Sequence, residues 1–190
     1  MDFYPIDLPV PAGSRTERIL LRPLTVGHVD LDYDAVMESR KELRAWSQTT
    51  WPSDEFTLAE NRADLERHQR EHGERVAFTY TVLTPTENRC LGCVYITPVP
   101  DAIAHDYPDA DYAANVGFWV RTSERDTGLE YHLLATLRRW FAAEWSFDRV
   151  IYSISQTGTQ QGDLLNSAGL THLADFALAD GRSRRAYGES

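Results

Sequence analysis

The chain has 190 residues, of which 42% are hydrophobic and 11% aromatic, and its formal net charge is −10 at pH 7. This composition suits one domain with a substantial core and is unlike that of a disordered chain. The acidic balance argues against a nucleic-acid partner, which needs clustered Lys and Arg. It fits a cationic partner such as an amine, although acidity also serves solubility alone.

No apolar run approaches the roughly 20 residues of a membrane span, and residues 1–5 lack the basic and apolar regions of a signal peptide. We therefore expect a cytoplasmic location and no membrane partner. Cys90 and Cys93 have neither a second Cys pair nor a His cluster beside them, so no zinc site is expected. Their odd spacing on a strand predicts opposite faces of the sheet, with both thiols buried and free.

Residues 1–14 are rich in proline and predict an extended lead-in, which leaves residues 15–190 as a single domain. The alternating segment 17–24 predicts a first strand. Thr25 is a suitable N-cap for a helix over residues 26–40.

A second helix begins at Ser53 or Thr57 and ends at Gly73, since glycine favours the position where a helix stops. Segments 75–83 and 90–96 have the alternation of strands and form a hairpin across a polar turn.

Segment 98–111 predicts a loop, because prolines interrupt it. Two functions are open for its polar side chains, metal binding or attraction of a cationic acceptor, and a solvated loop is the plain alternative. These side chains are Asp101, His105, Asp106, Asp109 and Asp111.

The central stretch runs from an apolar strand over residues 112–120, through a polar loop ending at Gly128, to an amphipathic helix over residues 129–145. A strand, a tight loop and a helix N-terminus together can bind an anion, because the first amides of a helix have no partner within it. An ordinary connection between a strand and a helix is the alternative.

The C-terminal part predicts a strand over residues 148–155, a short helix over 160–169 and a strand over 170–178. Asp180 and Gly181 then form a hairpin turn, from which residues 182–187 return as a last edge strand.

Several stretches resemble the ribosomal-protein-acetylating branch of the GNAT N-acetyltransferases. That branch often shows A-E-I-G-Y-W-V and then R/Q-x-x-G-x-G/A at the start of a helix. This chain has A-N-V-G-F-W-V over residues 114–120 and R-D-T-G-L-E over residues 125–130. T-E-R-I-L-L-R-P-L-T over residues 16–25 and L-L-N-S-A-G-L over residues 164–170 add to the resemblance. Gly158 and Gln161 stand where the family usually has Asn and Ser.

The resemblance implies an α/β fold: a mixed, mostly antiparallel sheet with helices on both faces and a splayed cleft between strands 116–120 and 149–155. It implies acetyl-CoA as co-substrate, with the pantetheine arm along the first strand and the pyrophosphate on amides of the following helix. The cofactor candidates are Trp119, Val120, Arg121, Arg125, Asp126, Thr127, Gly128, Leu129 and Glu130; no residue is assigned to a metal.

The chain departs from the family at several of these positions. Asp126 and Glu130 stand where small residues are common, and two carboxylates near a phosphate predict CoA binding weakened by about tenfold to a hundredfold. Asn115 occupies the place of a candidate general base, and an amide accepts no proton at neutral pH. It stays the candidate catalytic position, with Asp109, Asp111 or a water as other sources of a base.

Leu165 occupies the place of the Tyr that protonates the thiolate in many relatives, and Tyr131 and Tyr152 are the nearest tyrosines in the sequence. Trp46 and Trp51 are candidates for the wall of an acceptor pocket in the family, with core packing as the alternative. Asp109 and Asp111 are the acidic candidates on the acceptor side.

The first functional hypothesis is an N-acetyltransferase that moves an acetyl group to the primary amine of a small molecule or a protein N-terminus by direct attack. The second is a non-catalytic relative that binds CoA weakly or binds another ligand. The third is an acidic interaction module that keeps only the fold. A homodimer is left open.

Overall fold

The computed structural model describes residues 3–106 and 113–189. Its sheet has eight strands in the order β1-β2-β3-β4-β5-β6-β8-β7, and only β5 and β6 pair in parallel, which confirms the mixed, mostly antiparallel sheet. The strands are β1 (Ser14–Arg15), β2 (Leu20–Pro23), β3 (Phe78–Leu83), β4 (Cys90–Pro98), β5 (Ala113–Val120), β6 (Arg149–Ser155), β7 (Thr171–Ala177) and β8 (Ser183–Gly188).

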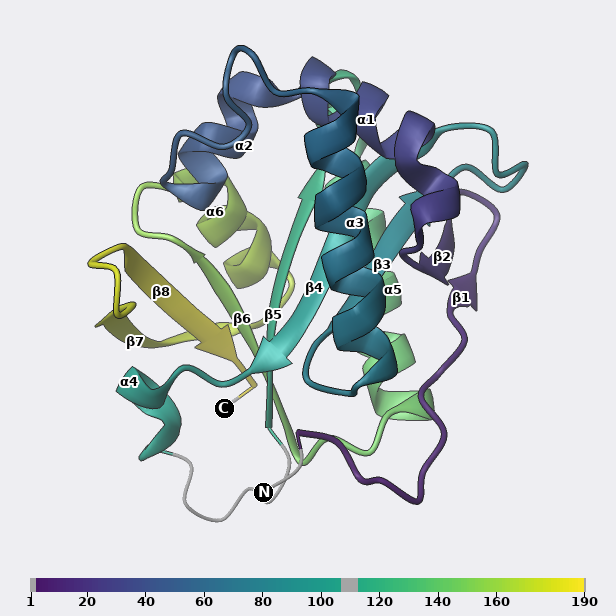
Figure 1. Ribbon diagram of the computed structural model, residues 1–190. Coiled ribbons are helices and arrows are strands. Elements are labelled where there is room, and N and C mark those ends of the chain that lie inside the picture. Colours follow the sequence, from purple (N-terminus) through teal and green to yellow (C-terminus); the bar gives the residue numbers. More distant parts are fainter. Residues whose placement is uncertain (1–2, 107–112, 190) are drawn as a thin grey trace.

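Helices cover both faces of this sheet, with α3 crossing one face and α5 lying behind the other (Figure 1). The helical segments are η1 (Val26–His28), α1 (Val29–Glu38), α2 (Arg40–Ser47), α3 (Leu58–Gly73), α4 (Asp101–Ala104), η2 (Thr122–Thr127), α5 (Leu129–Glu144) and α6 (Thr159–Ser167). In the described part of the chain, every helix is too short or too polar to cross a membrane.

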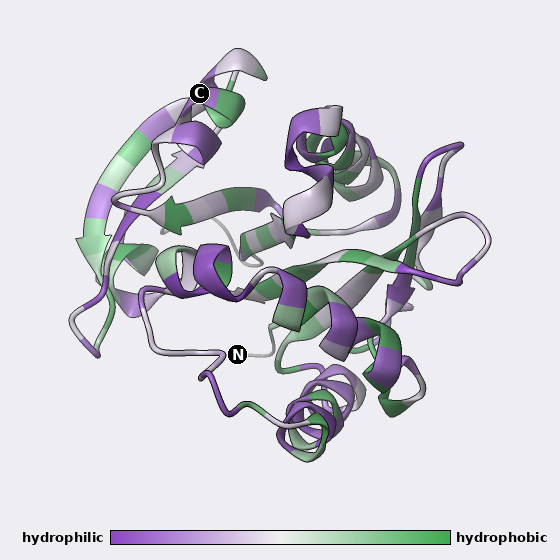
Figure 2. Ribbon diagram, turned by 90° about the horizontal axis from the view of Figure 1, so that it is seen from above, coloured by the Kyte–Doolittle hydropathy of each residue, from purple (hydrophilic) through white to green (hydrophobic). Residues whose placement is uncertain are grey.

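The apolar stripe predicted for the central helix is buried, as expected. On α5, Leu133, Leu134 and Leu137 are fully buried in the larger core cluster, against strands β3 to β6. The opposite face of the sheet carries a second cluster beneath α1 and α3. The ribbon of Figure 2, coloured by residue hydropathy, shows many hydrophilic residues on the helices and many hydrophobic ones along the strands between them. The sheet is therefore the middle layer of three.

The predicted cleft is present where β5 and β6 separate. The two strands pair only from Ala113 opposite Arg149 to Val116 opposite Tyr152. Beyond that point the backbone of residues 117–120 has no partner on β6, and Gln161 of α6 reaches across to donate to the carbonyl of Phe118 at 3.0 Å. The parallel pair thus closes at one end and opens at the other.

The prediction that Cys90 and Cys93 point to opposite faces is wrong. Leu83 pairs with Cys90 but Val82 pairs with Gly92, so Leu91 is an extra residue in a β-bulge. One inserted residue reverses the alternation that follows it, and both cysteines enter the cluster beneath α1 and α3. They are buried and free, as predicted.

The last strand is not an edge strand either. β8 lies between β6 and β7 and pairs antiparallel with both, so β7 forms the edge. In the segment predicted as a loop, Asp101–Ala104 forms the short helix α4. Asp109 and Asp111 lie outside the described residues.

Candidate active site

A tight connection links β5 to α5 at the open end of the splay. After Val120 the chain forms the 3-10 turn η2 and then Gly128, whose φ of 75° is left-handed, a conformation that glycine adopts without strain. α5 begins at the next residue, and the amide of His132 bonds to the carbonyl of Gly128 at 3.1 Å. The amides that precede His132 in the first turn have no acceptor within the helix. The strand, the tight turn and the helix start that the sequence predicts are therefore present.

A cavity of about 420 Å³ lies between this connection, α2 and the start of α6, and we call it the loop pocket. Its volume falls within the roughly 300–1,000 Å³ of small-molecule sites. The cavity includes the unpaired end of β5 and the open end of β6. Its lining includes Lys41, Trp46, Trp119, Val120, Arg125, Glu130, Ser155, Thr157 and Gln161.

A second cavity of about 520 Å³ lies on the α3 side of the sheet, and we call it the tryptophan pocket. Trp46 lines both cavities, so the two adjoin at that side chain. The floor of the tryptophan pocket comes from β4, β5 and β6, and its walls come from α2, α3 and the β7–β8 hairpin. Its lining includes Trp46, Trp51, Asp64, Arg67, His68, Tyr95, Asn115, Ser153, Phe176, Arg182 and Arg184.

The family model for the acetyltransferase (GNAT) domain matches residues 18–171. The chain belongs to the GNAT acetyltransferase family. None of the curated proteins compared with it matches its sequence.

Solved structures of GNAT acetyltransferases share the fold. RimL, a ribosomal L7/L12 alpha-N-protein acetyltransferase in complex with coenzyme A, has a TM-score of 0.71 at 17% identity, over 94% of this chain and 95% of that one. The ribosomal-protein-S5-alanine acetyltransferase of Vibrio fischeri gives 0.70 at 15%, over 94% and 96%. The microcin C7 self-immunity acetyltransferase MccE, in complex with acetyl-CoA and AMP, gives 0.73 at 12%, over 95% and 97%. At these identities the likeness concerns the fold.

Asp126 and Glu130, the two carboxylates predicted to weaken CoA binding, have different surroundings. Glu130 is 8% exposed and lines the loop pocket, and burial raises the pKa of its carboxyl while the charge of Arg125 opposes that rise. Asp126 is exposed and is not part of the described pocket lining. Of the two, only Glu130 is placed to act directly on an anion in the pocket.

The other loop candidates divide in the same way. Trp119, Val120 and Arg125 line the loop pocket, and Arg125 donates to Gln160 at 2.6 Å. Leu129 is buried in the core. Thr127 is exposed, and its hydroxyl donates to the carbonyl of Glu124 at 2.7 Å. Thr127, Gly128 and Leu129 could therefore contact an anion through their backbone amides and not through their side chains.

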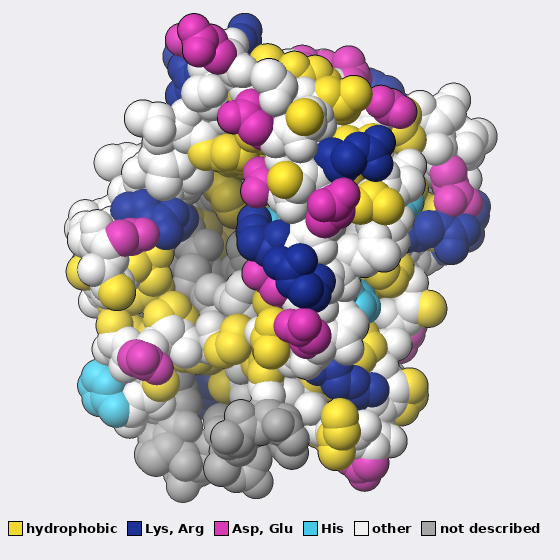
Figure 3. All heavy atoms as spheres, in the orientation of Figure 1, with side chains coloured by type: hydrophobic (Ala, Val, Ile, Leu, Met, Phe, Trp, Pro, Cys, Tyr) yellow, Lys and Arg dark blue, Asp and Glu magenta, His cyan; other side chains and the backbone are white. Residues whose placement is uncertain are grey.

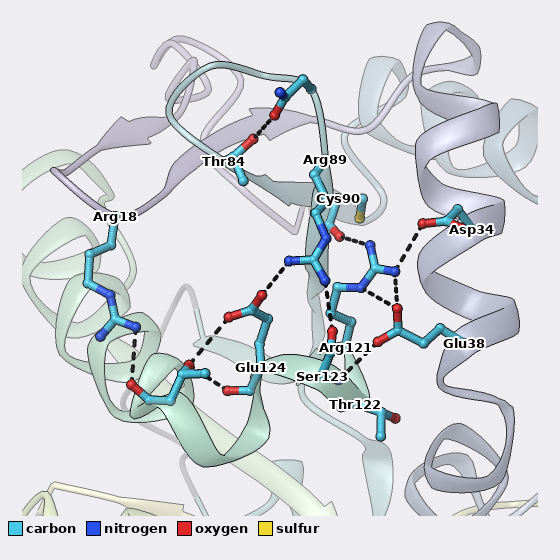
Figure 4. A network of polar contacts seen from close by, with 12 residues as sticks. Arg18, Asp34, Glu38, Thr84, Arg89, Cys90, Arg121, Thr122, Ser123 and Glu124 are labelled. Carbon is cyan, nitrogen blue, oxygen red and sulfur yellow. Dashed lines mark hydrogen bonds and ion pairs between the residues drawn. The ribbon is translucent and has the colours of Figure 1, made fainter.

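Arg121 has a different position from the one expected of a phosphate ligand. Its guanidinium is buried and bonds to the Cys90 carbonyl at 2.9 Å, to Asp34 at 3.0 Å and to Glu38 through two nitrogens (Figure 4). Hydrogen bonding by Arg121 lowers the pKa of the Glu38 carboxyl to about 2. Arg121 therefore fastens the end of β5 to α1, and it is not among the described residues that line the loop pocket.

Asn115 lies on the floor of the tryptophan pocket, just before the strands separate. Its Nδ2 donates to Thr97 of β4 at 3.1 Å, and its Oδ1 accepts a short hydrogen bond from the hydroxyl of Ser153 on β6. Both ends of the amide are thus engaged with the neighbouring strands. This arrangement suits a link across three strands and leaves no group on Asn115 that could accept a proton.

Trp46 and Trp51 both line the tryptophan pocket, and each also packs against other aromatic rings. Gly117 lets Trp46 approach the sheet, because a Cβ at that position would lie 3.3 Å from the Trp46 ring. Trp46 and Trp51 therefore form part of the pocket wall and also pack against the core.

His68 is a pocket residue to which the sequence assigned no role. It comes from α3, and its Nδ1 lies 3.1 Å from the Thr79 hydroxyl and 3.2 Å from Glu71. Burial lowers the pKa of this imidazole, which is therefore neutral near pH 7. The sequence signal that could have indicated His68 is its position on the same side of the helix as Leu65, which faces the sheet. Of the two tyrosines considered, Tyr131 is 56% exposed and Tyr152 is buried in the core, and neither is part of the described lining of these pockets.

Proposed function

We propose that this GNAT protein transfers the acetyl group of acetyl-CoA to a primary amine of a small molecule or a protein N-terminus by direct attack. The observation that carries the proposal is the splay of β5 and β6, which opens where two cavities adjoin at Trp46. One cavity serves a long anionic co-substrate, and the other receives the amine. A direct attack needs such a meeting point, because both reactants must be held together.

On the CoA side, the pyrophosphate binds the amides of the connection and the first turn of α5, from Arg125 to Glu130. The pantetheine arm follows the unpaired backbone of Trp119 and Val120. Arg125, which faces the loop pocket, adds a positive charge. Arg18 adds another nearby, since it donates to the carbonyl of Thr127 at 3.2 Å.

On the acceptor side, the amine must lose a proton and the departing thiolate must gain one. His68 is the imidazole of the tryptophan pocket, neutral near pH 7, to which we assign the proton of the amine, through water. This role requires Arg67, whose Nη2 donates to the Nε2 of His68 at 3.2 Å, to release that atom. Ser155 lines the loop pocket at the open end of β6, where its hydroxyl lies 3.0 Å from that of Thr157. These hydroxyls supply a proton route to the thiolate. The role of Asp109 and Asp111 as acceptor-side carboxylates remains a proposal.

The second candidate function is a non-catalytic relative that binds CoA weakly or binds another ligand. Two observations favour it. Glu130 presents a carboxylate to the pocket where a phosphate would bind, and Asn115 has its amide fully engaged with Thr97 and Ser153.

Two measurements separate these functions. Isothermal titration with CoA tests the loop pocket, and release of free CoA thiol from acetyl-CoA, with a panel of amines and short peptides, tests transfer. Amine-dependent thiol release above the rate of hydrolysis supports the acetyltransferase. CoA binding without transfer to any amine supports the second candidate, and absence of CoA binding retires the acetyltransferase.

A further inference from the structure

Arg184 on β8 projects a buried cation into the tryptophan pocket. The residue is 9% exposed, and it forms part of the pocket lining. Its Nη1 donates to the carbonyl of Trp46 at 3.1 Å, and its guanidinium carbon lies 5.9 Å from the centre of the Trp46 ring. Across residues 3–106 and 113–189, no carboxylate forms an ion pair with it.

The other arginines of this pocket are neutralised. Arg67 pairs with Asp64 at 3.5 Å and with Glu71 at 3.2 Å. Arg182 pairs with Asp180 at 2.7 Å. Asp64 is the sole carboxylate in the described lining, and Arg67 already engages it. Arg184 is therefore the arginine of the described pocket lining that no carboxylate pairs with, although the whole chain carries a net charge of −10.

A buried charge without a counter-ion is unfavourable, so the arrangement around Arg184 needs an explanation. The ring and the carbonyl of Trp46 offset part of that cost. Burial lowers the pKa of Arg184, the charge of Arg182 adds to the effect and the more distant charge of Asp180 opposes it, and a guanidinium keeps its charge at neutral pH. Its remaining N–H donors form the planar fork that matches a carboxylate or a phosphate.

We infer that the acceptor is an amine that also carries a carboxylate or phosphate group, which binds Arg184 while the amine faces the splay. The inference rests on the proposed acetyl transfer and names its substrate class. Arg184 pairs with Ser155 across β6 and β8, so the anion site lies beside the open end of β6. Figure 3 shows the hollow between the β7–β8 hairpin and α3, with Lys and Arg side chains on both sides.

The walls of the pocket indicate what joins the two charged groups. Trp46, Trp51, Tyr95 and Phe176 all contribute to the lining, and aromatic walls favour an apolar or aromatic body. An amino acid with an aromatic side chain, or a peptide that presents an amine and a nearby carboxylate, fits this description. A purely cationic amine, which the acidic composition suggests, leaves Arg184 without a partner.

The test compares ligands that differ only in the anion, on protein saturated with CoA. Isothermal titration measures the Kd of two pairs of acetylated products, which bind without turnover. The carboxylate pair is N-acetylphenylalanine and N-acetylphenethylamine, and the phosphate pair is N-acetyl-O-phosphoethanolamine and N-acetylethanolamine. We expect the anionic member of at least one pair to bind about 10- to 100-fold more tightly, as charge-assisted hydrogen bonds allow. The pair with the larger ratio distinguishes carboxylate from phosphate.

Arg184→Met should reduce that ratio to about threefold or less, and Arg184→Lys should retain part of it. Arg62→Met removes an exposed cation of α3 and is the matched control, with an unchanged ratio expected. A thermal melt shows whether each variant is folded. If Arg184→Met does not fold, the affinity ratio of Arg184→Lys decides the test. Equal affinities in both pairs for the natural protein, or an undiminished ratio in the Arg184 variants, would overturn the inference.

Thiol release with the free amines separates this inference from the proposed function. Transfer to phenethylamine at the same efficiency as to phenylalanine would reject the anionic acceptor and leave the acetyltransferase intact. A preserved anion preference without transfer to any amine would reject acetyl transfer, and with it the assignment of the anion site to an acceptor.

Discussion

Replacing Glu130 with Gln should strengthen CoA binding, and the structure sets the size of the effect. Glu130 is 8% exposed, lines the loop pocket and is next to the amides where the pyrophosphate is proposed to bind. Two unit charges about 6 Å apart at an effective dielectric of about 20 repel by about 3 kcal/mol. Screening by Arg125 and by solvent at the pocket mouth reduces this to about 1 kcal/mol. The expected gain is therefore about fivefold in Kd.

Isothermal titration with CoA at low and at high salt measures this gain, which should shrink as salt rises. Asp126→Asn removes the neighbouring charge from an exposed site and is the matched control, with a change below about twofold. The pH dependence gives a second signature. Burial raises the pKa of Glu130. Acidification through that pKa protonates the Glu130 carboxyl of the natural protein, so the difference in CoA affinity between the natural protein and Glu130→Gln should become smaller.

Two results would refute this reasoning. One is a Glu130→Gln protein that binds CoA no more tightly than the natural one at either salt concentration. The other is an equal gain from Asp126→Asn, which would mean that the general charge of the loop matters rather than the carboxylate in the pocket.

The remaining predictions concern the support of the site. Burial raises the pKa of Asp32 to about 6 although Asn61 donates to it at 3.0 Å, so the folded state binds its proton more tightly than the unfolded state, and its stabilising effect at low pH is lost as pH rises through 6. Asp32→Asn should remove about 2 kcal/mol of the difference between the unfolding free energies at pH 4 and pH 7. Urea titrations at both pH values test this, and an unchanged difference contradicts it. Arg121→Leu should lower the unfolding free energy by about 2 kcal/mol and Tm by about 4–8 °C. The control Arg89→Leu removes a more exposed ion pair with Glu124 and should lower the unfolding free energy by less than about 1 kcal/mol. Equal shifts in Tm would show that Arg121 is not the main link between β5 and α1. Gly117→Ala should push against Trp46, whose ring would lie 3.3 Å from the new Cβ, and weaken acceptor binding about tenfold. CoA binding should weaken less, although Trp46 also lines the loop pocket, and equal losses for both ligands would contradict the assignment of the amine to the tryptophan pocket.

The sequence determined the features that depend on neighbours along the chain. The alternation in β5, the leucine stripe of α5 and the glycine between them predict a strand, a left-handed turn and a helix, because each is fixed by local backbone preference and by burial of one face. The N-cap at Thr57 is local in the same way. The amide of Glu60 donates to the Thr57 hydroxyl, and the amide of Thr57 donates to the Glu60 carboxylate, which together form a capping box at the start of α3. The family patterns added the mixed, mostly antiparallel sheet and the position of the splay.

Only the tertiary structure decided where several side chains point. Leu91 forms a bulge that brings Cys90 and Cys93 to one face, and β8 inserts between β6 and β7. Arg121 leaves the expected phosphate site for Asp34 and Glu38, which are more than 80 positions away in sequence. Arg184 meets Trp46 across 138 positions. Strand order, register and long-range ion pairs depend on segments that meet only after folding, so the charge that faces each pocket is a property of the packed sheet.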